Sequence, residues 1–480
     1  MGVSPKWPQN DPQVGAAQVP NPLSHEVQMA SQPHNALIAL IAAAAMLACS
    51  ACSDEAATAA QQDDQPDAQT QDVPQDDDTA EPDADEPITN PCLEMLAEGT
   101  TFEAAPNAPD TQIHASVAFD GQSVWVVYNQ PEQGDGGNFD VMVTRLGCDG
   151  QAQVDPIKVN TLTGINFIDP TVAWGGDDRL VVAWQGDNGM QPNNLDVYMR
   201  TFARDGAPNA DQETLVETNR NGQTQNGNAW MTKVRAMADG QGFVLAGARG
   251  LEEAGRFQTF IQRLTPNAQL DGDTADGFFL AEVTQVEPAV AVTDDGTIWA
   301  AWTSGDGDGD IVHNHWSPGD QTPGEPAMAT LGSPSGGATM VTMGDGQRVA
   351  LAFQANQGGD SQIILKDAAV EQPDGIQAIF GVQGRIDAGP KLAANDTNGG
   401  AIFWHRVISG FRTELFIRGF EFPDDGSTPR AVGDEQQIPT DAPAALYQPA
   451  MVHVGDGVYF LVWSEGDNPA FRLKGRFVRL

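Results

Sequence analysis

Apolar and polar positions follow one repeated pattern from Gln112 to Leu480: a short apolar strand, a Gly/Asp turn, and a second apolar strand that ends in a large aromatic residue. We count seven repeats. The first strands are anchored at Val117, Val172, Val234, Val290, Met340, Leu392 and Met451. The second strands end at Tyr128, Trp184, Gly247, Trp302, Phe353, Trp404 and Trp463. A period of about 40 to 60 residues built from strands indicates an array of equivalent β units.

The second repeat shows the unit most clearly. Strands are expected at 170–174 and 180–184, a third at 196–202 and a fourth at 213–217, with Gly/Asp turns between them. Four short strands of this kind are typical of a propeller blade. The sequence therefore predicts an all-β fold, a seven-bladed β-propeller of four-stranded blades. A six-bladed count stays open, because the third repeat has Gly247 where the others have an aromatic residue.

The last repeat contains only three strands, which leaves its blade one strand short. An extra apolar segment around Phe102 precedes the first repeat. Phe102 lies 15 residues before Val117, as Ile157 lies 15 residues before Val172. We therefore expect this N-terminal strand to complete the last blade and to close the ring, which would leave no exposed sheet edge there.

Three segments with different compositions predict the domain organisation: a leader and signal peptide at 1–48, a lipid anchor and disordered acidic linker at 49–91, and the propeller at 92–480. The apolar run at 36–48 has 13 residues, fewer than the roughly 20 that a membrane-spanning helix needs. Residues 54–91 contain 13 acidic residues and no Lys or Arg, a composition that cannot form a core.

A cysteine follows the apolar run directly. The sequence 46–50 (MLACS) resembles a bacterial lipoprotein signal, in which the chain is cut before a cysteine that then receives a lipid. The resemblance implies lipidation of Cys49, with Cys52 as the alternative. An ordinary secretory signal cut near Ala51 and an uncleaved anchor also remain open. Each of these predicts a protein of the cell envelope, either an outer-membrane lipoprotein or a secreted protein, and not a cytoplasmic one.

Two cysteines remain in the exported part, Cys92 and Cys148. An even count in an oxidising compartment predicts one disulfide between them, and two free thiols are the alternative.

The part from Cys92 onward has 51 acidic and 23 basic residues, a net charge of −28. A field of this sign repels phosphate backbones and anionic lipid head groups. We therefore expect no nucleic-acid partner, and contact with the membrane only through the N-terminal lipid. An extracellular protein or a glycan is the expected partner of a monomeric body.

Candidate metal ligands occur together in the fourth repeat. Asp306, Asp308 and Asp310 alternate with glycine, as carboxylates do in loops that bind Ca²⁺, and Ca²⁺ is the only cofactor that the sequence suggests. A solvated acidic hairpin tip is the alternative, with Asp310 opening the third strand. His313 and His315 share one face of that strand. His313 aligns with Val143, Met199 and Ile363 of other repeats, so we expect a hydrogen-bonded packing histidine in preference to a metal ligand.

No sequence motif marks a catalytic site. Residues 293–299 are similar to the Asp-box of sialidases, but they lie between the first and second strands instead of the third and fourth. The recurring tryptophans are expected in the core, with a ring of stacking surfaces as the alternative. We therefore assign no catalytic residues and favour a binding or interaction module. A glycoside hydrolase or lyase with a dispersed site and a structural envelope component are the alternatives.

The lipoprotein prediction is tested by partitioning of the exported protein between detergent and water. We expect the wild type in the detergent phase and the Cys49→Ala protein in the aqueous phase, because the acyl chains are lost with the thiol. Cys52→Ala is the matched control and should partition as the wild type does. A Cys49→Ala protein that stays in the detergent phase would instead indicate Cys52 or a membrane-spanning anchor.

Overall fold

The structure is a computed structural model, and its chain divides into two units, Met1–Pro87 and Ile88–Leu480. The second unit is the subject here. The structure describes residues 90–480 except 109–110, 133–136, 176–177, 188–194, 217–228, 238–239, 251–256, 277–284, 306–308, 321–322, 331–334, 358–359, 371–376, 410–411, 442–444 and 468–469. Cys49, Cys52, Asp306 and Asp308 lie outside these residues.

The described unit consists of antiparallel sheets and one short helix, α1 (Pro91–Glu94). Four consecutive sheets have four strands each, in sequence order. The first two contain β2 (Ile113–Phe119), β3 (Val124–Pro131), β4 (Phe139–Leu146) and β5 (Ala152–Lys158), then β6 (Phe167–Gly175), β7 (Arg179–Asp187), β8 (Leu195–Ala203) and β9 (Thr214–Val216). The next two contain β10 (Ala229–Ala236), β11 (Phe243–Gly250), β12 (Phe257–Leu264) and β13 (Leu270–Asp276), then β14 (Gln285–Val292), β15 (Ile298–Ser304), β16 (Asp310–Trp316) and β17 (Ala327–Met328).

The following eight strands form one sheet of two antiparallel halves, which a single parallel pairing of Ser361 with Ile386 connects. The halves are β18 (Ser335–Thr342), β19 (Val349–Gln357), β20 (Asp360–Asp367) and β21 (Gln377–Phe380), then β22 (Ile386–Ala394), β23 (Gly399–Ser409), β24 (Arg412–Glu421) and β25 (Arg430–Ile438). The last sheet contains β26 (Ala445–Gly455), β27 (Val458–Asp467), β28 (Ala470–Arg479) and β1 (Thr101–Glu103).

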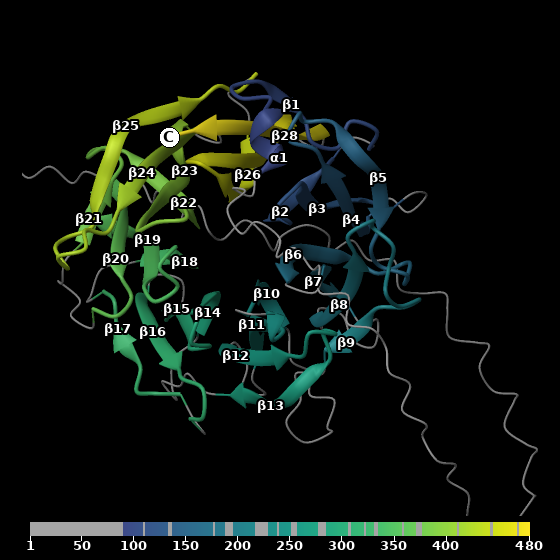
Figure 1. Cartoon of the computed structure of the whole chain (residues 1–480), viewed down its shortest axis with the longest axis horizontal. Coiled ribbons are helices and arrows are strands. Elements are labelled where there is room, and N and C mark those ends of the chain that lie inside the picture. The colour runs from purple at the N-terminus through teal and green to yellow at the C-terminus, as the bar shows by residue number, and fades with distance from the viewer. Residues whose placement is uncertain are drawn as a thin grey trace, which may run out of the picture. The chain divides into compact units, whose positions relative to one another are not determined.

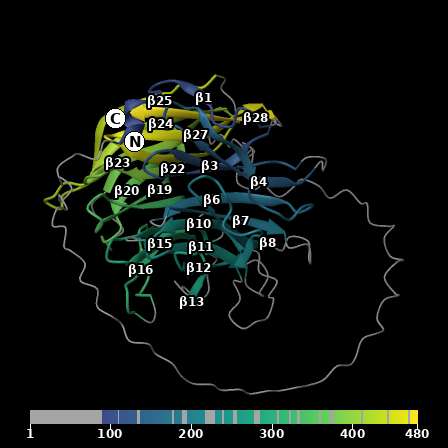
Figure 2. The same ribbon diagram turned by 45° about the vertical axis from the view of Figure 1, so that its right-hand side comes forward.

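The first strand of each repeat lies innermost, and the fourth lies at the periphery (Figure 1). Each inner strand contacts the inner strand of the next repeat, in the order β2, β6, β10, β14, β18, β22 and β26. Strand β26 in turn contacts β2, which brings the last repeat beside the first. The same succession of sheets can be followed from a second direction in Figure 2.

The N-terminal strand pairs where the sequence predicts it. Phe102 lies opposite Gly475 in an antiparallel pairing of β1 with β28. Its ring packs against Phe460 and Phe477 at centroid distances of 6.1 and 6.0 Å, and it covers Gly150 of the β4–β5 turn. The predicted disulfide between Cys92 and Cys148 is present, with a Cα–Cα distance of 5.1 Å, and it ties α1 to the same turn.

The core lies between neighbouring sheets, and the recurring tryptophans belong to it. Trp184, Trp302, Trp404 and Trp463 are fully buried, which confirms packing residues and excludes a ring of exposed stacking surfaces. In the third repeat, the ring of Phe260 on β12 occupies the space that an aromatic residue fills elsewhere: a Cβ atom at Gly247 would lie 2.6 Å from it. The irregular sequence therefore still builds a four-stranded sheet.

The histidine of β16 differs from the expectation in one respect. His313 is 2% exposed and packs against Trp299, but neither ring nitrogen has a hydrogen-bond partner, so the prediction of a hydrogen-bonded histidine is wrong. The register also places Leu365, not Ile363, at the equivalent position of β20, since His313 pairs with Ala301 as Leu365 pairs with Ala352. Burial, then the charges of Lys366 and His315, lowers the pKa of His313 to about 4.

In the described residues, no helix has the length and apolar character needed to cross a membrane.

The contribution of β1 to the stability of the last sheet is tested with Phe102→Ala. We expect the free energy of unfolding to fall by about 2 kcal/mol, because removal of the half-buried ring leaves a cavity beside Phe460 and Phe477. Thermal unfolding measures the change, and Leu162→Ala, at an exposed position, is the control. Equal melting temperatures for the two variants would show that β1 does not hold the last sheet.

His313 predicts acid sensitivity of the fold. Between pH 6.5 and about 4 the unfolded chain protonates this imidazole and the folded chain does not, so the free energy of unfolding falls as the pH falls. The full shift corresponds to about 3 kcal/mol. We expect His313→Met, which copies Met199 of β8, to be less acid-sensitive than the wild type in denaturant titrations at pH 7 and 4.5. His315→Gln, an exposed neighbour, should retain the wild-type dependence. The same dependence in His313→Met would contradict the assignment.

Candidate functional site

One irregularity recurs in all seven inner strands of the described unit. The pairing of each inner strand with the second strand of its repeat shifts register at a two-residue bulge. The bulges lie at 114–115, 169–170, 231–232, 287–288, 337–338, 389–390 and 448–449. Bulges re-aim side chains and are frequent beside active sites. The second bulge residue is proline in four of these strands, where a missing N–H costs no ladder hydrogen bond.

The first bulge residue adopts the left-handed backbone conformation in five strands. Glycine accounts for two of them, Gly337 and Gly389, both with φ of +63°. The other three are His114 (+56°), Asp169 (+49°) and Glu287 (+55°). A non-glycine residue in this conformation costs of the order of 1–3 kcal/mol, and such strain concentrates at functional sites. Three ionisable side chains are therefore held at a strained backbone, on the inner strands β2, β6 and β14.

Cationic side chains follow the bulges on two of the strands. The position after the bulge carries Lys233 on β10 and Lys391 on β22, and Arg235 lies two residues beyond Lys233. The same position carries a small residue in the other inner strands, namely Ser116, Thr171, Ala289, Thr339 and Ala450. We call Asp169, Lys233, Arg235, Glu287 and Lys391 the axial cluster.

The members of the axial cluster act on one another electrostatically. Burial, followed by the charge of Lys233, lowers the pKa of Lys391 to about 8, while Glu287 opposes the shift. Burial likewise lowers the pKa of Lys233, against the attraction of Asp169. Both lysine side chains are half-buried. A lysine with a pKa near 8 is partly neutral at physiological pH and can accept a proton.

The two carboxylates are held by specific contacts. The Nδ1 atom of His114 lies 2.7 Å from Oδ1 of Asp169, and both side chains are about one-fifth exposed. Glu287 accepts hydrogen bonds from the Thr303 hydroxyl at 3.1 Å and from the backbone N–H of Gly337 at 2.7 Å. These contacts fix the position of each negative charge relative to the lysines.

A second histidine packs beside Lys391. The ring of His405 occupies the space above Gly389, where a Cβ atom would lie 2.8 Å from it. Burial and then the charge of Lys391 lower the pKa of His405 to about 4, so its imidazole is neutral at physiological pH. Its Nδ1 atom is buried and has no hydrogen-bond partner. Glycine is therefore required at position 389 both for the backbone conformation and for the ring.

The metal prediction receives no support from the described residues. Asp306 and Asp308 lie outside them, and Asp310 accepts a hydrogen bond from the hydroxyl of Thr330 at 2.9 Å. His315 is exposed and tilted against Trp299 at 4.8 Å. Within the residues that the structure describes, no three His, Cys, Asp or Glu side chains are close enough to share a metal ion.

The sequence interpretation missed the axial cluster. One signal was present: the residues before the recurring prolines at 170, 288, 390 and 449 are Asp169, Glu287, Gly389 and Gln448. A carboxylate or glycine before a strand-initial proline is unusual in a buried strand. Aligning the repeats on those prolines would have placed the charged residues in one layer.

Comparisons with known proteins support the fold alone. No protein-family model matches the chain, and no curated protein does. The chain is similar to a polysaccharide lyase of family PL25, an ulvan lyase bound to a GlcA–Rha3S unit, with a TM-score of 0.51 and 11% identity over 76% of this chain and 93% of that one. It is also similar to a protein of unknown function from Dyadobacter fermentans (TM-score 0.49, 10% identity, 80% of this chain and 98% of that one) and to the Trypanosoma rangeli sialidase (TM-score 0.45, 11% identity, 76% and 54%).

Proposed function

We propose that the described unit is a seven-bladed β-propeller, closed by β1, that cleaves an acidic glycan at the axial cluster. The order of the inner strands, the contact of β26 with β2 and the pairing of β1 with β28 support the architecture. The lipoprotein-like sequence at Cys49 supports export and anchorage outside the cytoplasm. An ulvan lyase with the same fold shows that such a scaffold can hold a glycan-cleaving site.

The observation that carries this proposal is the grouping of Lys233, Arg235 and Lys391 beside strained, ionisable bulge residues. A lyase that acts on a uronic acid needs cations to neutralise the sugar carboxylate, which acidifies the neighbouring C–H bond. It also needs a base with a pKa near the working pH. Lys233 and Arg235 supply the cations, and Lys391 supplies the base.

The reaction is a β-elimination. The neutral amine of Lys391 takes the proton from C5 of the uronate, and the electron pair of that bond forms a double bond between C4 and C5. The C4–O4 bond breaks, and the leaving oxygen takes a proton from a water molecule. The products are one chain that begins with a 4,5-unsaturated uronate and a second chain with a new reducing end.

The acidic surface does not exclude this substrate. The net charge of −28 acts over long range, and at physiological salt its field decays over about 8 Å. The cluster acts at contact distance inside the ring of inner strands, where salt screens less. Binding of the polymer should therefore strengthen as salt rises from low to physiological concentration, opposite to the trend for a basic protein.

The proposal is tested with purified protein and a panel of uronate-containing polysaccharides, including sulfated glucuronate–rhamnose polymers. We expect products with the ultraviolet absorbance of a conjugated C4–C5 double bond. Lys391→Met should reduce kcat by about 10²–10⁴-fold, because the proton acceptor is lost. In the wild type, kcat/KM should rise with pH through about 8, as Lys391 of the free protein loses its proton.

Lys158→Met, on the peripheral strand β5, is the matched control and should retain wild-type kcat. Saturable binding of these polymers without any product would overturn the proposal in favour of a binding module. New reducing ends without ultraviolet absorbance would identify a hydrolase instead. Activity that survives in Lys391→Met would remove this lysine from the reaction.

A further inference from the structure

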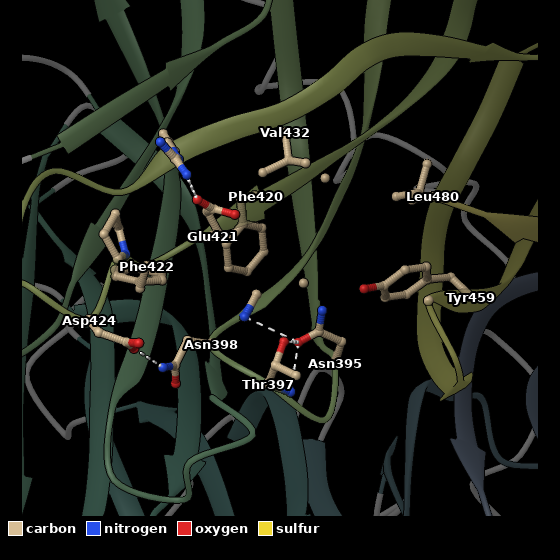
Figure 3. Close-up of a pocket in the computed structure, with 16 residues that line it drawn as sticks. Asn395, Thr397, Asn398, Phe420, Glu421, Phe422, Asp424, Val432, Tyr459 and Leu480 are labelled. Atoms are coloured by element: carbon tan, nitrogen blue, oxygen red, sulfur yellow. Dashed lines mark hydrogen bonds and ion pairs between the residues drawn. The ribbon is translucent and has the colours of Figure 1, made fainter.

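Two places along β22 differ in how far a ligand can reach their side chains. The cavity beside the β22–β23 turn has a volume of about 530 Å³ (Figure 3). Its aromatic side chains are closed to a ligand, because Phe420 and Tyr459 are each 2% exposed. Lys391, which follows the bulge on the same strand, is half-buried and therefore partly open to solvent. The axial cluster is thus the more accessible of the two places.

The level of the inner strands that carries Lys391 is partly open to solvent. In five of the seven inner strands the residue after the bulge is half-buried, namely Ser116, Lys233, Thr339, Lys391 and Ala450. Thr339 and Ala450 lie on β18 and β26, the inner strands that contact β22 on either side. Both have short side chains, so a small molecule can approach the longer side chain of Lys391 at this level.

Positive charge reaches Lys391 from a strand that is not its neighbour. Lys233 and Arg235 lie on β10, which β14 and β18 separate from β22 in the order of the inner strands (Figure 1). Their charges nevertheless act on Lys391, and that of Lys233 acts more strongly than that of Arg235. Glu287 and Asp169 act in the opposite sense. The side chains must therefore extend into the space that the inner strands surround.

The amine of Lys391 has no direct partner among the described residues. Burial and charges at a distance act on it, and no described side chain forms a hydrogen bond or an ion pair with it. These influences lower its pKa to about 8. A substantial fraction of the amine is therefore neutral at physiological pH, as a nucleophile must be.

A neutral amine close to other cations is suited to forming imines with carbonyl compounds. The nitrogen of Lys391 bonds to the carbonyl carbon, and the carbonyl oxygen takes up a proton to give a carbinolamine. The C–O bond then breaks, the oxygen leaves as water, and the nitrogen forms a double bond to the carbon. The amine loses two hydrogens in total, so amine and carbonyl compound give imine and water. The charges of Lys233 and Arg235 favour a carbonyl compound that also carries a carboxylate.

We propose that Lys391 forms an imine with small 2-oxo carboxylates, whose carboxylate group binds to Lys233 and Arg235. In such a molecule the carboxylate is bonded directly to the carbonyl carbon, so the cations that hold the carboxylate also place the carbonyl group beside the amine. The adduct consumes the free amine and would therefore inhibit proton transfer at the axial cluster. This last consequence rests on the proposed function, whereas imine formation itself does not.

The test is reductive trapping of the full-length protein with pyruvate and sodium cyanoborohydride at neutral pH, followed by peptide mass spectrometry. Reduction converts the imine into a stable N-(1-carboxyethyl)lysine. We expect Lys391 to be trapped about tenfold faster than Lys158, because more of its amine is neutral and nearby cations attract pyruvate. Lactate, which has the carboxylate but no carbonyl group, should slow trapping at Lys391 and not at Lys158.

Pyruvamide, the uncharged amide of pyruvate, is the matched control ligand. It should be trapped at Lys391 about tenfold more slowly than pyruvate, the effect of one lost charge-assisted hydrogen bond. Lys233→Met should slow trapping of pyruvate at Lys391, whereas Lys158→Met should leave it unchanged. Thermal unfolding of each variant verifies that it is folded.

The inference is overturned if Lys391 is not trapped, or is trapped no faster than Lys158. Equal rates with pyruvate and pyruvamide would also overturn it, because the carboxylate would then not be recognised. The trapping assay contains no glycan, so its failure would leave the proposed elimination intact. Failure of the elimination assay would likewise leave the trapping result intact.

Discussion

The repeated bulge of the inner strands is the constraint on which the axial site depends. A regular strand would alternate its side chains between the two neighbouring sheets, where the core excludes charge. The bulge interrupts that alternation at one level in every repeat, and a left-handed residue there re-aims the side chain. Asp169 and Glu287 reach the same electrostatic neighbourhood as Lys233 and Lys391 because all four strands are interrupted at the same height. The strain at three non-glycine residues is the cost of that arrangement.

Positive charge is concentrated at the inner strands of a body that is otherwise strongly acidic. The exported part is strongly acidic, yet three cations and two carboxylates meet at the inner strands. Burial, and then repulsion from Lys233, lower the pKa of Lys391, and a ligand carboxylate would oppose the shift.

Much of the fold could be predicted from the sequence, because each repeat contains its own strand and turn signals. The anchors at Val172 and Trp184, the N-terminal strand at Phe102 and the disulfide of Cys92 with Cys148 are all found where local patterns placed them. Local patterns failed in the fifth repeat. The pairing of β19 with β20 extends farther toward the connecting loop than the pairing of β15 with β16 in the fourth repeat. An alignment on the start of the third strand therefore selects Ile363, whereas the residue equivalent to His313 is Leu365.

The axial cluster could not be predicted in the same way. Its residues are separated by more than two hundred positions from Asp169 to Lys391, and each looks ordinary within its own strand. Only the common height of the bulges brings them together, and a register shift leaves no clear mark in a strand pattern. The prediction of a hydrogen bond for His313 was wrong for a related reason. The sequence shows that a histidine replaces an apolar residue, but it does not show whether a hydrogen-bond partner lies within reach.

We infer that the axial cluster is an electrostatically coupled site for an acidic sugar. The most direct measurement is the NMR titration of Lys391 in protein with ¹³C-methylated lysines, assigned by Lys391→Arg, with and without a glucuronate oligosaccharide. The account predicts a pKa of about 8 in the free protein and a higher pKa with the oligosaccharide bound, because the ligand carboxylate stabilises the ammonium form. A lysine that titrates near its ordinary value of about 10.4 and does not respond to the oligosaccharide would contradict it.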